Sequence, residues 1–123
     1  MKKILVIDDE VPTLQMLKLF LEACGYIVLT AENADSGLEI FDREKPPIVL
    51  TDIKMPGKDG FSILKTIKER RPQTEVMVIT GHGDKDLAKQ AFDLDATEFF
   101  NKPLDTDALD AALARLEERS KAD

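Results

Sequence analysis

The stretch Ile48-Val49-Leu50-Thr51-Asp52 decides how the rest of the chain can fold. Three consecutive aliphatic residues after the pair Pro46-Pro47 are typical of a central parallel strand that is buried on both faces. Proline is tolerated at the start of such a strand because its first residue need not donate a hydrogen bond. Asp52 then lies where the strand ends, and ligands bind at the carboxyl edge of open α/β sheets. We therefore predict that Asp52 belongs to a functional site.

Other apolar runs alternate along the chain with segments of helical periodicity. Strands are predicted at residues 3–7, 26–31, 48–52, 75–79 and 97–101. Helices are predicted to begin near Pro12, after Asn33 or Asp35, at Asp59-Gly60, near Asp84 and near Asp105 or Thr106. Five strands that alternate with five helices predict a parallel sheet with right-handed connections and helices on both faces. Strand order 2-1-3-4-5 is usual at this size, so we predict a flavodoxin-like, doubly wound α/β fold.

Two of the predicted helices carry a specific expectation about which side chains are buried. In the first, Leu14, Leu17, Leu21 and Cys24 recur at helical spacing before Gly25, which supplies a left-handed stop. In the fourth, from about residue 84 to 94, the side chains expected to face inward are Leu87, Ala88, Ala91 and Phe92. Each set predicts one apolar stripe that packs on the sheet.

The composition is that of one soluble globular domain spanning residues 1–123. No apolar run approaches the length of a membrane span, and no signal-peptide pattern precedes the first strand. The single Cys24 cannot form an internal disulfide, so we expect a packed thiol in a reducing cytoplasm. A net charge of -7 argues against direct nucleic-acid binding by this domain.

The predicted strand order brings polar side chains from four strands to one edge of the sheet. These side chains are Asp8, Asp9, Asp52, Thr80 and Lys102. Converging carboxylates repel one another unless a cation is present, and ligation by oxygen alone favours Mg²⁺. A metal ion, an ammonium and a hydroxyl around one carboxylate describe a site for a phosphoryl group. Asp52 would attack that group and form an aspartyl phosphate.

Together these residues resemble the receiver domain of two-component response regulators. The resemblance rests on Asp8-Asp9, on Asp52 with the motif Met55-Pro56-Gly57-x-Asp59-Gly60, on Thr80 and on Lys102-Pro103, and it spans essentially the whole chain. It implies that Asp52 is the phosphoacceptor, that Asp9 binds Mg²⁺ directly and that Asp8 orients a metal-bound water. The main-chain carbonyl of Lys54 would complete the metal site.

The resemblance also implies a switch between two conformations. Lys102 would pair with the phosphoryl group, and the Lys102-Pro103 peptide bond is expected to be cis. Thr80 would move to hydrogen-bond a phosphoryl oxygen, and Phe99 would swing inward with it. The surface formed by the fourth helix, fifth strand and fifth helix would change as a result.

Four positions depart from the family pattern or flank the site. Asp95 stands where the family usually has glycine, so the fourth helix is expected to end without an easily left-handed residue. Phe99 lacks a hydroxyl that could support its inward position. Lys54 and His82 lie two residues beyond Asp52 and Thr80, where residues of this family tune the loss of the phosphoryl group. Protonation of His82 is expected to change that rate.

We interpret the sequence as a signalling domain that catalyses only its own phosphorylation and dephosphorylation, and not as a conventional enzyme. The phosphoryl group would come from a sensor histidine kinase or a histidine phosphotransfer protein. An effector domain in a longer native chain and a phosphorylation-dependent homodimer are the further partners that this interpretation leaves open. No membrane partner is expected.

Three other functions remain as alternatives. A Mg²⁺-dependent phosphatase of the aspartyl-phosphate type usually has a second carboxylate two residues past the nucleophile, where this chain has Lys54. A flavin or nucleotide carrier is disfavoured because the acidic segment Asp8-Asp9-Glu10-Val11 offers no cradle for phosphate. A docking scaffold that is never phosphorylated is disfavoured because every key residue is present.

Overall fold

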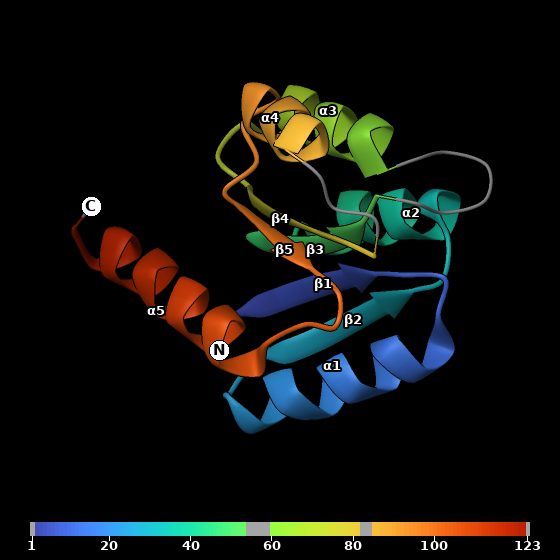
Figure 1. Cartoon of the computed structure of the whole chain (residues 1–123). Coiled ribbons are helices and arrows are strands. Elements are labelled where there is room, and N and C mark those ends of the chain that lie inside the picture. The colour runs from blue at the N-terminus through green and yellow to red at the C-terminus, as the bar shows by residue number, and fades with distance from the viewer. Residues whose placement is uncertain (1, 54–59, 82–84, 123) are drawn as a thin grey trace.

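The computed structural model describes residues 2–53, 60–81 and 85–122 of the chain. Its strands are β1 (Lys3–Ile7), β2 (Ile27–Ala31), β3 (Ile48–Asp52), β4 (Glu75–Thr80) and β5 (Glu98–Asn101). Its helices are α1 (Val11–Ala23), α2 (Ala34–Glu44), α3 (Gly60–Arg70), α4 (Lys85–Asp93) and α5 (Thr106–Ala122) (Figure 1). Among the described residues, no helix has both the length and the apolar character that crossing a membrane requires.

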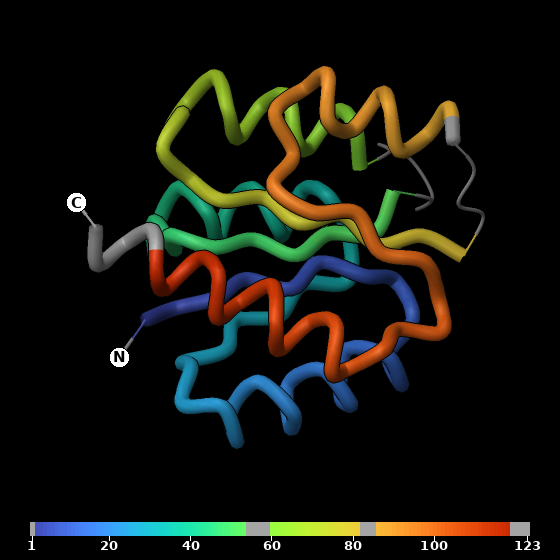
Figure 2. The backbone as a smooth tube through the Cα atoms, turned by 60° about the vertical axis from the view of Figure 1, so that its left-hand side comes forward, coloured from blue at the N-terminus to red at the C-terminus, as the bar shows by residue number. Residues whose placement is uncertain are grey.

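The strands form one parallel sheet with the order β2-β1-β3-β4-β5, which confirms the predicted flavodoxin-like topology. All five residues of β3 are buried, because this strand lies between β1 and β4 and both faces of the sheet are covered. Helices α1 and α5 cover one face, and α2, α3 and α4 cover the other (Figure 1). Figure 2 shows that β1 begins and α5 ends on the same side of the molecule.

Two hydrophobic cores lie on opposite sides of the sheet because side chains alternate along each strand. In β1, Leu5 and Ile7 pack beneath α2 and α3, whereas Ile4 packs beneath α1 and α5. In β5, Phe99 contacts the first core and Phe100 the second. The sequence-based expectation that these two aromatic residues face opposite ways is therefore confirmed.

Two predictions of burial were wrong. Cys24 is exposed, because α1 ends at Ala23 and Cys24 is the capping residue beyond the stripe that Leu21 completes. Phe92 is 48% exposed, whereas its neighbour Ala91 is fully buried. Ala91 packs in the core, and Phe92, about 100° further round α4, lies where the helix turns toward solvent.

The helix ends follow local chemistry. The Asn33 side chain caps α2 by accepting a hydrogen bond from the Ser36 N–H at 2.8 Å, as one of the two predicted caps. Gly25 has the predicted left-handed conformation, with φ of 97°. Asp95 also adopts a left-handed conformation, with φ of 69°, at the position where the sequence analysis noted the absence of an easily left-handed glycine. Aspartate tolerates this region better than most residues because its short side chain bonds locally.

Tyr26 links the turn after α1 to the last helix. Its hydroxyl donates to Glu117 Oε1 at 3.1 Å, and the residue is only 6% exposed. Burial, followed by the hydrogen bond to Glu117, raises the pKa of Tyr26 to about 12. Because the folded pKa is raised, the stability that this group contributes is present below the unfolded pKa of about 10 and is lost as pH rises through about 12.

We expect an absorbance titration of the phenolate to show its midpoint near pH 12. Tyr26 is the only tyrosine and the chain has no tryptophan, so the signal belongs to one group. Glu117→Gln removes the neighbouring negative charge and should lower this midpoint, whereas Glu118→Gln on the same helix should leave it unchanged. A midpoint typical of free tyrosine, while circular dichroism still shows the native fold, would contradict the prediction.

Candidate functional site

Four strands place polar side chains at one edge of the sheet. Asp52 is the last residue of β3 and Thr80 the last of β4, whereas Asp8 follows β1 and Lys102 follows β5. Because the strands are parallel, their carboxyl ends meet at the same edge. Asp8 and Thr80 are fully buried, and Asp52 is 3% exposed. These side chains are therefore held by the sheet and not by solvent-exposed loops.

The ammonium of Lys102 lies at the centre of the site. Its Nζ is 3.0 Å from Asp52 Oδ2 and 3.0 Å from Asp8 Oδ2, and it also pairs with the Glu10 carboxylate. The Lys102 main-chain N–H donates to the Thr80 carbonyl at 2.8 Å, which ties the end of β4 to the residue after β5. The Lys102-Pro103 bond is cis, as predicted.

The pKa values show how strongly these charges interact. Burial alone would lower the pKa of Lys102, but hydrogen bonds to Glu10 and Asp52 and the nearby Asp8 carboxylate raise it above its usual value. The Lys102 side chain is therefore charged at neutral pH. Burial raises the pKa of Asp8, although the Glu10 N–H at 2.9 Å and the Lys102 ammonium act in the other direction. The hydrogen bond from Lys102 lowers the pKa of Glu10.

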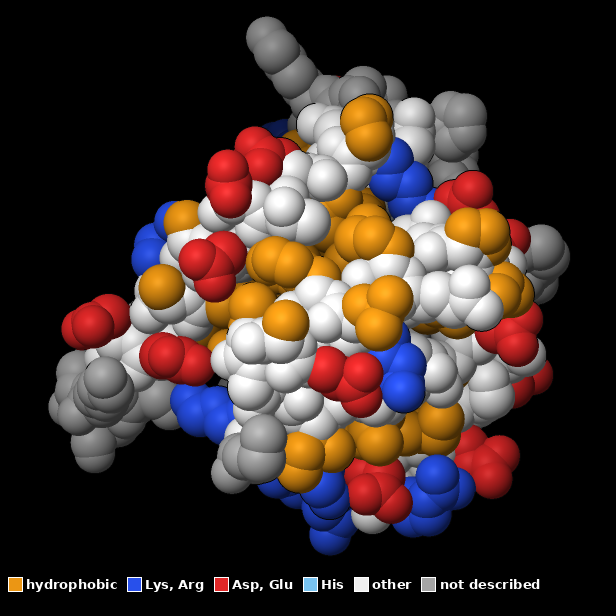
Figure 3. Space-filling view, turned by 90° about the horizontal axis from the view of Figure 1, so that it is seen from below, with side chains coloured by type: hydrophobic (Ala, Val, Ile, Leu, Met, Phe, Trp, Pro, Cys, Tyr) orange, Lys and Arg blue, Asp and Glu red, His pale blue; other side chains and the backbone are white. Residues whose placement is uncertain are grey.

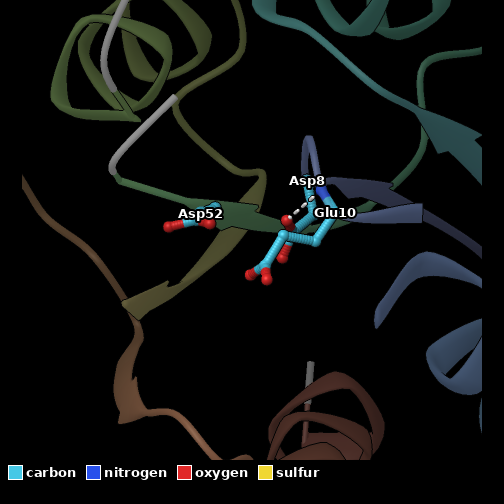
Figure 4. A group of neighbouring side chains, drawn as sticks. All are labelled: Asp8, Glu10 and Asp52. Atoms are coloured by element: carbon cyan, nitrogen blue, oxygen red, sulfur yellow. Dashed lines mark hydrogen bonds between the residues drawn. The ribbon is translucent and has the colours of Figure 1, made fainter. Parts of the chain in front are cut away.

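Three carboxylates of the site could hold a metal ion. Oxygen atoms of Asp8, Glu10 and Asp52 lie within 4.8 Å of one another, and Figure 4 shows where the three side chains lie at the ends of their strands. Three negative charges less the one ammonium of Lys102 leave a net charge of -2. Asp8 Oδ2 is buried, and apart from its ion pair with Lys102 it meets no hydrogen-bond donor among the described residues. A buried carboxylate oxygen with no further donor, in an all-oxygen site of this charge, fits a divalent cation such as Mg²⁺.

Residues 4–114 match the family model described as the response regulator receiver domain. The chain belongs to this family. Two-component and phosphorelay signalling is accordingly its context, and the receiver domain is a signalling module and not a conventional enzyme.

The receiver domain is similar to known proteins over most of its length. It is 33% identical over 114 residues to sporulation initiation phosphotransferase F of Bacillus subtilis (strain 168), covering 93% of this chain and 92% of that protein. It is 36% identical over 110 residues to the DNA-binding transcriptional regulator NtrC of Escherichia coli (strain K12), covering 89% of this chain. The chain spans about a quarter of the length of NtrC, since the match covers 24% of that protein.

Solved structures agree with the fold. A crystal structure of a response regulator receiver domain protein from Clostridium thermocellum is 41% identical, with a TM-score of 0.93 over 99% of this chain and 98% of that one. The BeF3-activated DrrB receiver domain is 30% identical, with a TM-score of 0.88 over 96% of this chain and 98% of that one.

The receiver domain brings together most of the site residues that the sequence singled out. Asp8, Asp52 and Lys102 are in contact, and Thr80 ends the neighbouring strand. Asp9 is exposed and is not one of the three carboxylates that converge among the described residues. Its role as a direct Mg²⁺ ligand therefore stays a prediction.

Glu10 was missed as a site residue by the sequence analysis. Its carboxylate reaches Lys102, which lies 92 residues further along the chain. The signal was present in the third acid of the run Asp8-Asp9-Glu10, but periodicity assigns Glu10 only to the start of a helix. Only the packing of the segment after β5 beside α1 shows that Glu10 faces the site.

Several predictions about the switch and its tuning are not tested by the structure. Lys54 and His82 lie outside the described residues, as does the motif Met55-Pro56-Gly57-Lys58-Asp59. Phe99 is half-buried against the core beneath α2 and α3. The roles of these residues remain predictions.

An apolar groove opens beside the ammonium of Lys102. Its volume is about 460 Å³, and its lining comes from the start of α1, the end of β4 and the segment before α5: Glu10, Thr13, Met16, Gly81, Pro103 and Leu104. Figure 3 shows hydrophobic side chains on the face that α1 and α5 cover. In α1, Met16 is 40% and Leu19 is 72% exposed. Exposed apolar surface next to a reactive group is typical of a site where another protein binds.

Proposed function

We propose that this receiver domain accepts a phosphoryl group on Asp52 in a Mg²⁺-dependent reaction. The observation that carries the proposal is the contact of the Lys102 ammonium with the Asp52 carboxylate at 3.0 Å, in a pocket where the same ammonium also lies 3.0 Å from the buried Asp8 carboxylate. The donor would be a phosphohistidine of a sensor histidine kinase or a histidine phosphotransfer protein. The groove between α1 and the segment before α5 would receive it.

The chemistry uses the residues of this chain as nucleophile and as charge stabiliser. An oxygen of Asp52 forms a bond to phosphorus while the bond from phosphorus to the donor imidazole nitrogen breaks, and that nitrogen keeps the electron pair. Lys102 neutralises charge on the equatorial phosphoryl oxygens. When bound, Mg²⁺ would supply further neutralisation, held by Asp8, Asp9, Asp52 and the Lys54 carbonyl. Hydrolysis of the acyl phosphate later restores Asp52.

The output of this reaction would be a change in the surface of α4, β5 and α5. Thr80 would donate its hydroxyl to a phosphoryl oxygen, and Phe99 would follow inward. The strand pairing supports a coupled movement of Phe99 and Thr80. Phe99 in β5 pairs with Val78 in β4, and Val78 lies two residues before Thr80. Lys54 and His82 would tune the lifetime of the phosphorylated state.

The altered surface would bind a second copy of the domain or an effector in a longer native chain. NtrC is named as DNA-binding, but the net charge of -7 here assigns any nucleic-acid contact to a part other than this domain. We further propose that residues 1–123 act as one domain, in the cytoplasm.

Incubation with acetyl phosphate tests the proposal on the unmodified chain. With Mg²⁺, intact-mass spectrometry should show one added phosphoryl group, hydroxylamine should remove it, and peptide mapping should locate it at Asp52. With excess EDTA, little or no addition is expected. Labelling that is independent of Mg²⁺, or that maps away from Asp52, would reject the proposed function.

A further inference from the structure

Glu10 differs from the other two carboxylates around Lys102 in how firmly it is held. The side chains of Asp8 and Asp52 are 1% and 5% exposed, whereas that of Glu10 is 58% exposed. Asp8 and Asp52 are fixed at the ends of β1 and β3 on short side chains. Glu10 reaches the ammonium over a longer side chain from the residue before α1. Figure 4 shows the Glu10 side chain extending beside Asp8.

The contacts of the Lys102 ammonium make Glu10 a competitor for it. A lysine ammonium has three N–H groups, and here three carboxylates surround it. A phosphoryl oxygen that binds Lys102 must therefore replace one of these partners. Replacing Glu10 costs the least free energy of the three, because its carboxylate already faces water and exposed ion pairs contribute little to stability.

We propose that Glu10 is a positioning residue that holds the Lys102 ammonium while no phosphoryl group is bound and releases it when one arrives. This inference rests on the proposed function, because it concerns the same site. Breaking the pair between Glu10 and Lys102 then opposes phosphoryl binding. Glu10 thus lowers the affinity of the site for a phosphoryl group and keeps the ammonium beside Asp52 between reactions.

Two substitutions separate the contact from the charge. Glu10→Gln removes the negative charge, whereas Glu10→Asp keeps the charge on a side chain one methylene shorter, which withdraws it from Lys102. If the contact is what matters, both variants free the ammonium. Glu32→Gln is the matched control, since Glu32 is an exposed carboxylate after β2 at the same edge of the sheet and does not belong to the cluster at Lys102.

Beryllofluoride is a phosphoryl mimic. Isothermal titration calorimetry, with beryllofluoride added to the Mg²⁺-saturated domain, measures the affinity of the site for it. Both Glu10 variants should bind beryllofluoride about 1.5- to fivefold more tightly than the wild type, which is the range for loss of one exposed ion pair. Glu32→Gln should match the wild type. A separate Mg²⁺ titration should show weaker metal binding in Glu10→Gln alone, because only this variant loses a charge.

Each contrary outcome has its own meaning. Equal or weaker beryllofluoride binding by both Glu10 variants would overturn the role of Glu10 while the proposed function stands. Tighter binding by Glu10→Gln but not by Glu10→Asp would show an effect of charge alone and would also overturn it. A wild-type domain that binds no beryllofluoride with Mg²⁺ would remove the proposed function and this inference together. Circular dichroism of each variant confirms that the fold is retained.

Discussion

Asp52→Asn is expected to abolish Mg²⁺-dependent phosphorylation by acetyl phosphate, with a loss of roughly 10² or more in the labelling rate. The amide has nearly the shape of the carboxylate, but its oxygen is a poor nucleophile and it carries no charge to pair with Lys102. The side chain is buried at the end of β3 and contacts the Lys102 ammonium, so its replacement removes the carboxylate that this site presents to the phosphoryl group. Intact-mass spectrometry over a time course measures the rate.

A matched substitution separates the chemistry from the fold. Asp95→Asn makes the same chemical change at an exposed position after α4, where asparagine also tolerates the left-handed conformation with φ of 69°. This variant should be labelled at the wild-type rate. Undiminished labelling of Asp52→Asn would instead place the phosphoryl group elsewhere.

Gly60→Ala is expected to have the second-largest effect, because Gly60 packs directly against the residue that carries the chemistry. A Cβ at this position would lie 2.3 Å from the Asp52 carbonyl oxygen and 2.6 Å from the Ile53 Cα. The Gly60 N–H also donates to the Ile53 carbonyl at 2.7 Å, so the first turn of α3 is tied to the end of β3. Backbone must shift to admit the methyl group.

We expect Gly60→Ala to lower the free energy of unfolding by about 1–3 kcal/mol, as overpacking does. It should also slow acetyl phosphate labelling by about tenfold or more, because small displacements of a reacting group are costly. Urea denaturation measures the first effect, and the mass-spectrometric time course measures the second. Unchanged stability together with unchanged labelling would show that the connection between β3 and α3 can shift freely.

Two other glycines provide controls for the Gly60 substitution. At Gly81 an added Cβ would meet only Lys102 Cδ, at 3.9 Å, so Gly81→Ala should preserve both stability and labelling. At Gly25 nothing lies within 4 Å, but φ is 97°. Gly25→Ala should therefore cost about 1–2 kcal/mol of stability through backbone strain, with labelling intact.

Much of the site could be predicted because parallel strands leave little freedom at their ends. Once the five strands and their order are known, the residues that follow β1, β3 and β5 must meet at one edge. Asp8, Asp52 and Lys102 were identified in this way, and the structure places them within ion-pair distance. The aromatic pair in β5 was also predictable, since alternation along a strand has a strict period.

Hydrophobic periodicity predicted burial wrongly where the burial of a side chain depended on the rotation of a helix or on the residue at which the helix ends. Phe92 and Cys24 both fit an apolar helical stripe by spacing, yet both are exposed. Packing against the sheet buries an arc of each helix, and the edges of that arc depend on how the helix is rotated. Ala91 and Leu21 lie inside the arc. Hydrophobic periodicity therefore predicts that a helix has a buried apolar stripe, but it does not predict well which residues lie at the edges of that stripe.

The amino-acid order by itself determined the topology, the buried central strand and the edge at which Asp52, Thr80 and Lys102 gather. These features follow from hydrophobic period and chain connectivity, which act over short stretches. Only the tertiary structure decided that Glu10 pairs with Lys102, that the buried Asp8 Oδ2 has no donor besides Lys102 and that Gly60 abuts the Asp52 carbonyl. These contacts join residues far apart in the chain or depend on ångström-scale packing, and no local pattern encodes such distances.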